Sequence, residues 1–233
     1  MLAASAARPA MIALLLRARA APRARDANRW SALHHAAYVG CAEGAALLLQ
    51  ALSLGDAAAQ DRWARTPLCY ACFGGHVATA AALLRGGAPP SGGKRPRAAQ
   101  LERFRNEWST PLHLAVQAAV PPREGRAAPR ATAEVAAELV QRLLEARADA
   151  RRLDQRGRTP LQEAEAAGCA AAASLLREAE QRTAPPPQQA QGGGAGAAAA
   201  AAARASEPSG AAAKRTRTRV PPEIGTAWIW PPG

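Results

Sequence analysis

Thr66-Pro67-Leu68-Cys69 is the first complete copy of a short phrase that recurs along this chain. It returns as Thr110-Pro111-Leu112-His113 and Thr159-Pro160-Leu161-Gln162, and a weaker copy, Ser31-Ala32-Leu33-His34, precedes all three. A phrase that recurs every few tens of residues is typical of stacked-repeat proteins, in which each unit contacts mainly its neighbours. The phrase therefore predicts a chain built from repeated structural units.

Each copy has the residue types of a helix start. The Ser or Thr is a preferred N-cap, because its hydroxyl accepts a hydrogen bond from unpaired backbone N–H groups of the first turn. The proline suits the first helical position, where a missing N–H costs nothing, and the leucine is the first core residue. Three copies also have a glycine seven residues after the leucine, which predicts a left-handed helix end: Gly40, Gly75 and Gly168. Leucine pairs further on predict a second helix in every unit.

The pattern resembles the ankyrin repeat, a turn followed by two antiparallel helices in about 33 residues. The second copy carries the resemblance most completely, at Asp61, Thr66, Pro67, Leu68, Ala71, Gly75, His76, Leu83, Leu84, Gly87 and Ala88. Asp26 and Asp154 also stand seven residues before a repeat leucine, as Asp61 does. The resemblance covers roughly residues 11–178 and implies an all-α ankyrin-repeat solenoid of stacked helix-turn-helix units with β-turn tips.

This register divides the chain into segments. We expect a partial repeat or targeting segment over 1–25, and repeats over 26–60, 61–105, 106–150 and 151–182. The intervals between repeat leucines exceed the usual period most in the later units, which predicts exposed loops over 89–105 and 119–133. The tail, 183–233, is rich in Ala, Gly, Pro and Arg and is expected to be disordered.

Two interpretations of residues 1–25 stay open. The segment contains five arginines and no acidic residue, which is typical of an organelle transit peptide. Its apolar run over 11–16 also aligns with a second repeat helix, which favours a degraded repeat that supplies one capping helix. Otherwise we expect a cytoplasmic or nuclear protein, because the four cysteines show no disulfide-scaffold spacing.

The net charge of +12 raises the alternative of a basic nuclear factor that binds nucleic acid or chromatin. A basic cluster over 214–219 could be a nuclear-import signal or a phosphate contact. However, only two basic residues are lysines, and arginine, alanine, glycine and proline all have GC-rich codons. The basicity is therefore explained as well by genome composition, and nucleic-acid binding is not favoured. No apolar run approaches the ~20 residues of a membrane-spanning helix.

The cysteines and histidines are the residues that could carry chemistry, and the repeat register assigns most of them to the core. Cys69 and Cys72 form a C-x-x-C pair, but they occupy small buried positions of a repeat helix. His34, Cys69 and His113 occupy equivalent places in successive units, about 8–10 Å apart, whereas zinc ligands lie about 2.0–2.3 Å from one metal. No phosphate loop or nucleophile elbow is present. We expect no enzyme activity, metal or cofactor.

The ankyrin resemblance implies a protein-interaction module or adaptor that binds a protein partner through its tips and concave face, and we expect a monomer. Trp, Tyr and Arg are enriched at binding hot spots, and several of them fall on these positions. The predicted partner-binding residues are Trp30, Tyr38, Arg62, Trp63, Arg65, Phe73, Trp108, Arg156 and Arg158. The apolar end of the tail, with Trp228 and Trp230, is a second candidate, either as a partner motif or as a segment that docks on the solenoid.

Overall fold

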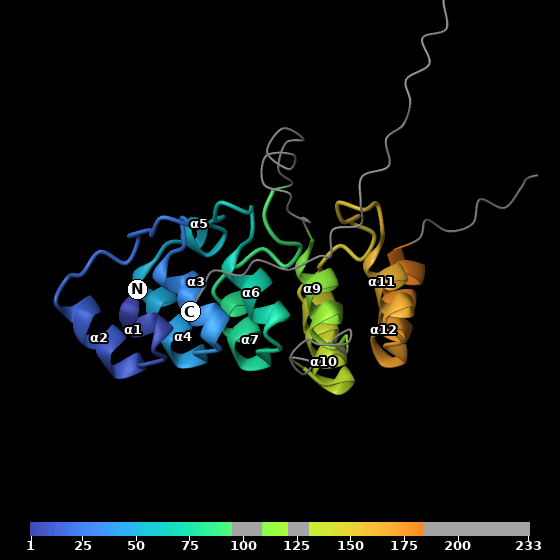
Figure 1. Cartoon of the computed structure of the whole chain (residues 1–233), viewed down its shortest axis with the longest axis horizontal. Coiled ribbons are helices and arrows are strands. Elements are labelled where there is room, and N and C mark those ends of the chain that lie inside the picture. The colour runs from blue at the N-terminus through green and yellow to red at the C-terminus, as the bar shows by residue number, and fades with distance from the viewer. Residues whose placement is uncertain (95–108, 121–130, 184–233) are drawn as a thin grey trace, which may run out of the picture. The chain divides into compact units, whose positions relative to one another are not determined.

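The computed structural model describes residues 1–94, 109–120 and 131–183, which form a series of helical pairs (Figure 1). In chain order the pairs are α1 (Leu2–Ser5) with α2 (Pro9–Arg17), α3 (Ala32–Val39) with α4 (Ala42–Ala51), α6 (Pro67–Phe73) with α7 (Val77–Arg85), α9 (Pro111–Ala118) with α10 (Ala133–Glu145), and α11 (Pro160–Ala166) with α12 (Ala170–Thr183). A short helix, α5 (Leu54–Ala57), lies between the second and third pairs. We call each pair, with the turn that precedes it, a unit, and that turn its tip.

The pairs stack in register. The first helices pack in the series α1, α3, α6, α9 and α11, and the second helices pack as α2, α4, α7, α10 and α12. Leucines from both series are fully buried between the units, among them Leu33, Leu68, Leu83 and Leu112. The predicted all-α stacked-repeat architecture is therefore confirmed. None of the described helices is long and apolar enough to cross a membrane.

The predicted helix starts are confirmed, although the hydroxyl groups are used differently from one unit to the next. Thr66, Thr110 and Thr159 are N-caps, and each is followed by proline at the first helical position. Thr159 Oγ1 accepts from the Gln162 N–H at 3.2 Å, as predicted. In α9, by contrast, Thr110 Oγ1 lies 2.8 Å from His113 Nδ1, so the hydroxyl pairs with a side chain.

The predicted helix-ending glycines are also confirmed. Gly40, Gly75 and Gly168 have φ angles of +80°, +74° and +69°, in the left-handed region that residues with a Cβ rarely adopt. Each of them reverses the chain between the two helices of one unit, so it sets the antiparallel hairpin.

The N-terminal segment contains more structure than the sequence indicated. The helix expected over 11–16 is α2, and a second helix, α1, precedes it. α1 packs against α3 while α2 packs against α4, and their buried side chains are Ala4 and Ile12. Residues 1–25 therefore supply a helix pair and not a single capping helix.

The cysteines lie where the repeat register placed them. Cys69 and Cys72 are buried in α6 as free thiols, and burial raises the pKa of both thiols. A raised pKa disfavours the reactive thiolate, which fits a packing role. The predicted loops over 89–105 and 119–133 fall largely outside the described residues. Of the tail predicted to be disordered over 183–233, Thr183 ends α12, and the rest, with its basic cluster and tryptophans, lies outside them.

Candidate partner-binding surface

The tip of the unit that contains α6 is organised by one carboxylate. The Asp61 N–H donates to the Arg65 carbonyl at 3.0 Å, and Asp61 Oδ1 accepts from the backbone N–H groups of Trp63 and Arg65 at 2.8 and 2.9 Å. An aspartate that accepts from backbone groups further along closes a tight turn. Asp26 and Asp154 bond their own tips in the same way. In these three units the aspartate seven positions before the repeat leucine is therefore the residue that closes the tip.

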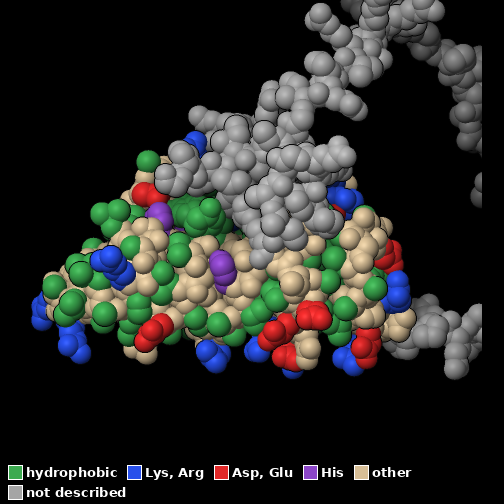
Figure 2. All heavy atoms as spheres, turned by 60° about the horizontal axis from the view of Figure 1, so that its bottom comes forward, with side chains coloured by type: hydrophobic (Ala, Val, Ile, Leu, Met, Phe, Trp, Pro, Cys, Tyr) green, Lys and Arg blue, Asp and Glu red, His purple; other side chains and the backbone are tan. Residues whose placement is uncertain are grey.

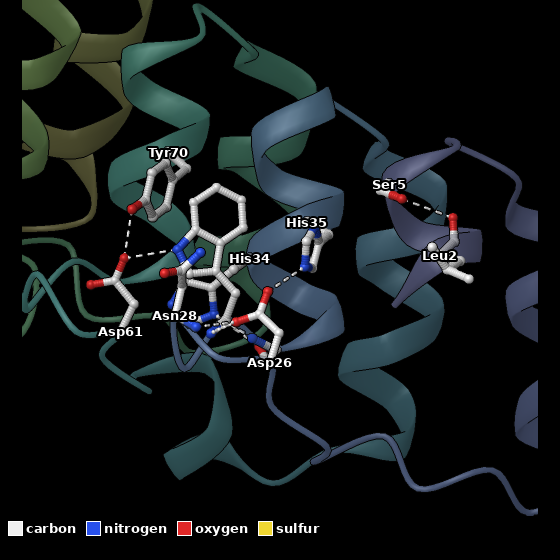
Figure 3. Close-up of polar contacts among 10 residues, drawn as sticks. Leu2, Ser5, Asp26, Asn28, His34, His35, Asp61 and Tyr70 are labelled. Carbon is white, nitrogen blue, oxygen red and sulfur yellow. Dashed lines mark hydrogen bonds and ion pairs between the residues drawn. The ribbon is translucent and has the colours of Figure 1, made fainter. Parts of the chain in front are cut away.

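The second oxygen of Asp61 joins two units. Asp61 Oδ2 accepts from Trp30 Nε1 at 3.0 Å and from the Tyr70 hydroxyl at 2.5 Å (Figure 3). All three side chains are buried, with exposed fractions of 2–3%. Burial raises the pKa of Asp61, and the Tyr70 hydroxyl and the backbone N–H groups oppose that shift. Burial and the Asp61 charge also raise the pKa of Tyr70, so its hydroxyl stays protonated and donates.

Trp30 lies at the centre of an aromatic cluster. Its ring centroid is 4.6 Å from that of Tyr70, 5.6 Å from that of Tyr38 and 5.0 Å from that of His35. That Trp30 contacts a partner stays a prediction, and only 3% of the residue is exposed in this structure. Its indole turns inward because Asp61, one unit further on, offers an acceptor that the buried N–H requires.

Arg62 and Trp63 lie on the outer side of this tip. The Arg62 guanidinium carbon is 5.3 Å from the centroid of the half-buried Trp63 ring, a cation–π arrangement. Arg62 Nη1 also donates to Asn28 Oδ1 at 3.2 Å, and the Arg62 N–H donates to the Asn28 carbonyl at 3.1 Å. The tips of two successive units are thereby held side by side.

Tyr38 and Phe73 take equivalent places near the ends of α3 and α6. Tyr38 is 37% exposed and Phe73 is half-buried. His76 Nε2 lies 3.1 Å from the Tyr38 carbonyl oxygen, which ties the end of α3 to the turn after α6. A Cβ added at Gly74 would lie 2.5 Å from the His76 ring, so this turn accepts no larger residue without displacing the histidine.

The histidines after the repeat leucines also link units. Ser31 N–H donates to His34 Nδ1 at 3.2 Å, so Nε2 carries the proton and donates to the Arg65 carbonyl at 3.3 Å. Burial lowers the pKa of His34 to about 4, which keeps the ring neutral. His113 Nε2 makes the same bond to the Arg158 carbonyl, at 2.9 Å. Both rings therefore position the tip of the following unit.

Of the remaining predicted residues, Arg65 belongs to this region, whereas Arg156 and Arg158 belong to the last unit. Arg65 lies with its guanidinium carbon 5.9 Å from the Tyr70 ring centroid, within the cluster of the second tip. Arg158 belongs to the last unit and pairs with Glu163 at 2.6 Å, and Arg156 is exposed on the same tip. Trp108 lies outside the described residues. The structure thus gathers Tyr38, Arg62, Trp63, Arg65 and Phe73, which we call the tip–concave surface.

Sequence reasoning missed two supports of this surface, Tyr70 and Asn28. The position of Tyr70 holds a different residue type in each unit, namely His35, Leu114 and Glu163, so the repeat pattern gave no signal there. Asn28 lies on the tip of the preceding unit, and its role in joining two tips depends on Arg62, a residue one unit away. Over the described ranges, no group of three or more His, Cys, Asp or Glu residues is arranged to hold a metal ion.

Comparison with known families agrees with this geometry. A family model described as ankyrin repeats (3 copies) matches residues 1–92, which include the N-terminal helix pair and both tips of the tip–concave surface. A search of curated proteins finds no match. The helix pairs continue in the same register to residue 183. Residues 1–92 therefore match the ankyrin-repeat family, and the helix pairs that follow resemble the matched ones in their order and stacking.

Proposed function

We propose that this protein is a non-enzymatic adaptor that binds a protein partner through the tip–concave surface. Ankyrin repeats generally mediate protein–protein interactions, which supports the general class of function. The observation that carries the specific proposal is the placement of Arg62 and Trp63 on the outside of a tip whose frame is buried and hydrogen-bonded.

The rigidity of the frame matters for affinity. Ordering side chains on binding costs about 0.5–1.5 kcal/mol for each rotamer-rich group. Here the backbone of the tip is fixed by Asp61, and Arg62 is already held by Asn28. A partner would therefore meet Trp, Tyr and Arg side chains, the residue types that dominate binding hot spots, on a preorganised support.

The alternative of a nuclear nucleic-acid-binding factor has less support in the arginines themselves. Five guanidinium groups form ion pairs in the described residues, namely those of Arg23, Arg142, Arg158, Arg177 and Arg182. These five arginines contact carboxylates and are therefore less available to a phosphate backbone, although the net charge of +12 already counts both partners of each pair. We propose a site of action in the cytoplasm or nucleus, where the four buried free thiols stay reduced.

The test is quantitative affinity purification from cells of the source organism. The full chain would be compared with an Arg62→Ala/Trp63→Ala double variant. Arg85→Ala, which removes an exposed arginine from the last turn of α7, is the matched control. We expect the double variant to lose specific protein partners and the control to retain them, while circular dichroism shows equal folding of all three.

Retention of every partner by the folded double variant would place the binding site elsewhere. A purified complex should also be measured at 50 and 200 mM salt. A phosphate-dominated complex with six to ten contacts loses about 10³–10⁵ in affinity over that range. A loss of that size, abolished by nuclease treatment, would instead establish the nucleic-acid alternative.

A further inference from the structure

The first helix pair leaves an apolar face uncovered. Ala4 and Ile12 pack toward α3 and α4, whereas Leu2, Leu14, Met11 and Leu15 are 87%, 57%, 43% and 41% exposed. Met11 and Leu14 are three residues apart on α2 and so lie on one side of the helix. We call these four exposed side chains the end face. A polar outer side is usual in the capping unit of a solenoid, whereas this side of the first described pair is apolar.

Positive charge surrounds the end face. Arg8, Arg17 and Arg19 are exposed, and residues 1–25 contain no acidic residue. No ion pair of these three guanidinium groups occurs in the part of the chain that the structure describes, whereas Arg23 pairs with Asp56. Figure 2 shows hydrophobic and basic side chains intermixed at this end of the stack, at its left.

The stacking geometry indicates what would cover such a face. Every other helix pair in the described series is covered on its corresponding side by the helices of the preceding unit. The uncovered side of α1 and α2 therefore offers the same kind of surface as those interfaces, and a helix is the element that packs on it. The arginines select a helix whose flanks are acidic.

A second copy of this chain is a poorer occupant. A symmetric end-to-end pair would bring Arg8, Arg17 and Arg19 of both copies together with no acidic residue from either segment 1–25. At the other end of the stack, Glu165 and Glu178 are already paired with Arg177 and Arg182. A symmetric pair is disfavoured because arginines of both copies would meet. A contact between the first unit of one copy and the last unit of another is disfavoured because the carboxylates there are already paired.

We infer that the end face binds an amphipathic helix of a partner protein, with leucine-type residues against Leu14 and Met11 and carboxylates beside Arg8, Arg17 and Arg19. This site is separate from the tip–concave surface, since it is formed by α1 and α2 and not by the tips. Occupation of the end face would cover the exposed apolar side chains of the first pair.

The experiment measures binding of three fluorescent model peptides to the full chain by anisotropy. The peptides share one leucine face and a helix-stabilising cross-link, and their polar faces are rich in Glu, Gln or Lys. Two variants test the face, Leu14→Asn and Arg17→Glu, because each residue is exposed and its replacement leaves Ile12 in place. Leu54→Asn, which changes another highly exposed leucine, on α5, is the control.

We expect the Glu peptide to bind most tightly, and Leu14→Asn and Arg17→Glu each to weaken it by about tenfold, the scale of one hot-spot side chain. Leu54→Asn should leave its affinity unchanged. Equal binding of the Glu and Lys peptides, or equal affinity of Leu14→Asn and the wild type, would overturn the proposal. Two other outcomes would also overturn the proposal. One is Leu14-dependent binding to vesicles that contain phosphatidylserine, with no binding of the Glu peptide. The other is a dimer in sedimentation velocity that Leu14→Asn abolishes.

Discussion

The buried network around Asp61 gives the sharpest test of how two units are held together. Replacing Tyr70 with Phe removes one hydroxyl and keeps the ring in the aromatic cluster. Asp61 Oδ2 then retains only the Trp30 indole as a donor, while Oδ1 keeps its two backbone N–H groups. Both oxygens of Asp61 accept hydrogen bonds and neither donates one, which is the pattern of an ionised carboxylate. A hydrogen bond to a charged group contributes about 1.5–3 kcal/mol to stability.

We therefore expect Tyr70→Phe to lower the free energy of unfolding by about 2 kcal/mol, which corresponds to a fall in Tm of roughly 4–8 °C for a domain of this size. Trp30→Phe should cost at least as much, because it also removes indole contacts. The double variant should lose more than the sum of the two, since Oδ2 would then be buried with no donor at all. A coupling of about 0.5–3 kcal/mol is typical of residues that share one partner.

The pH dependence provides an internal check. Burial raises the pKa of Asp61 in the folded state, so protonation of this group favours the folded state as the pH falls through that raised pKa. Removing the Tyr70 donor raises the pKa further, because that hydroxyl opposes the shift. The stability difference between wild type and Tyr70→Phe should therefore be largest at neutral pH and narrow as the pH falls.

The assay is urea denaturation followed by circular dichroism at 222 nm, which does not depend on the tryptophan that one variant removes. Wild type, both single variants and the double variant would be measured at pH 7 and at pH 5. Equal m-values would show that the same surface is exposed in each transition. A cost below about 0.5 kcal/mol for Tyr70→Phe, or strictly additive effects, would refute the reasoning.

Two further predictions concern the joints between and within units. Because burial lowers the pKa of His34 from 6.5 to about 4, this neutral histidine contributes stability above pH 6.5 that is lost as the pH falls. At 1.36 kcal/mol per pH unit, the loss by pH 5 is about 2 kcal/mol, and His34→Gln should flatten that part of the stability-against-pH curve; an unchanged curve would contradict it. Gly168→Ala should cost about 1 kcal/mol from its φ of +69° alone, since a Cβ there meets no atom within 4 Å. A thermal melt measures this, and a stabilised Gly168→Ala would show that the left-handed conformation carries no strain.

The phrase Thr-Pro-Leu determined a large part of the fold because its signals are local. An N-cap, a proline at the first helical position and a glycine at the helix end act within one or two turns, so Thr159, Pro160 and Gly168 could be placed from sequence alone. α1 has only four residues and no side-chain cap, and so it left no comparable pattern. Short elements of this kind form because a neighbouring unit packs against them.

The direction of a tip side chain could not be predicted in the same way. Register placed Trp30 and Arg65 at equivalent positions, four residues after Asp26 and Asp61. Trp30 turns inward because an acceptor in the next unit satisfies its N–H. That acceptor is 31 residues away and is available only once the two units stack. Repeat register gives the position of a residue along the solenoid, but burial depends on what the adjoining unit supplies.

This distinction decides which substitutions can report on binding. Trp30, Asp61 and Tyr70 position the tip from beneath, so their replacement changes both stability and the orientation of anything the tip presents. Loss of a partner in such a variant would not show that the replaced residue touches the partner, because the tip itself has changed. Arg62 and Trp63 contact the frame from outside, through Asn28 and through each other, and truncation of their side chains leaves the backbone N–H bonds to Asp61 in place. A loss of binding without a loss of stability is therefore expected only for the outer pair, and that combination identifies a contact surface.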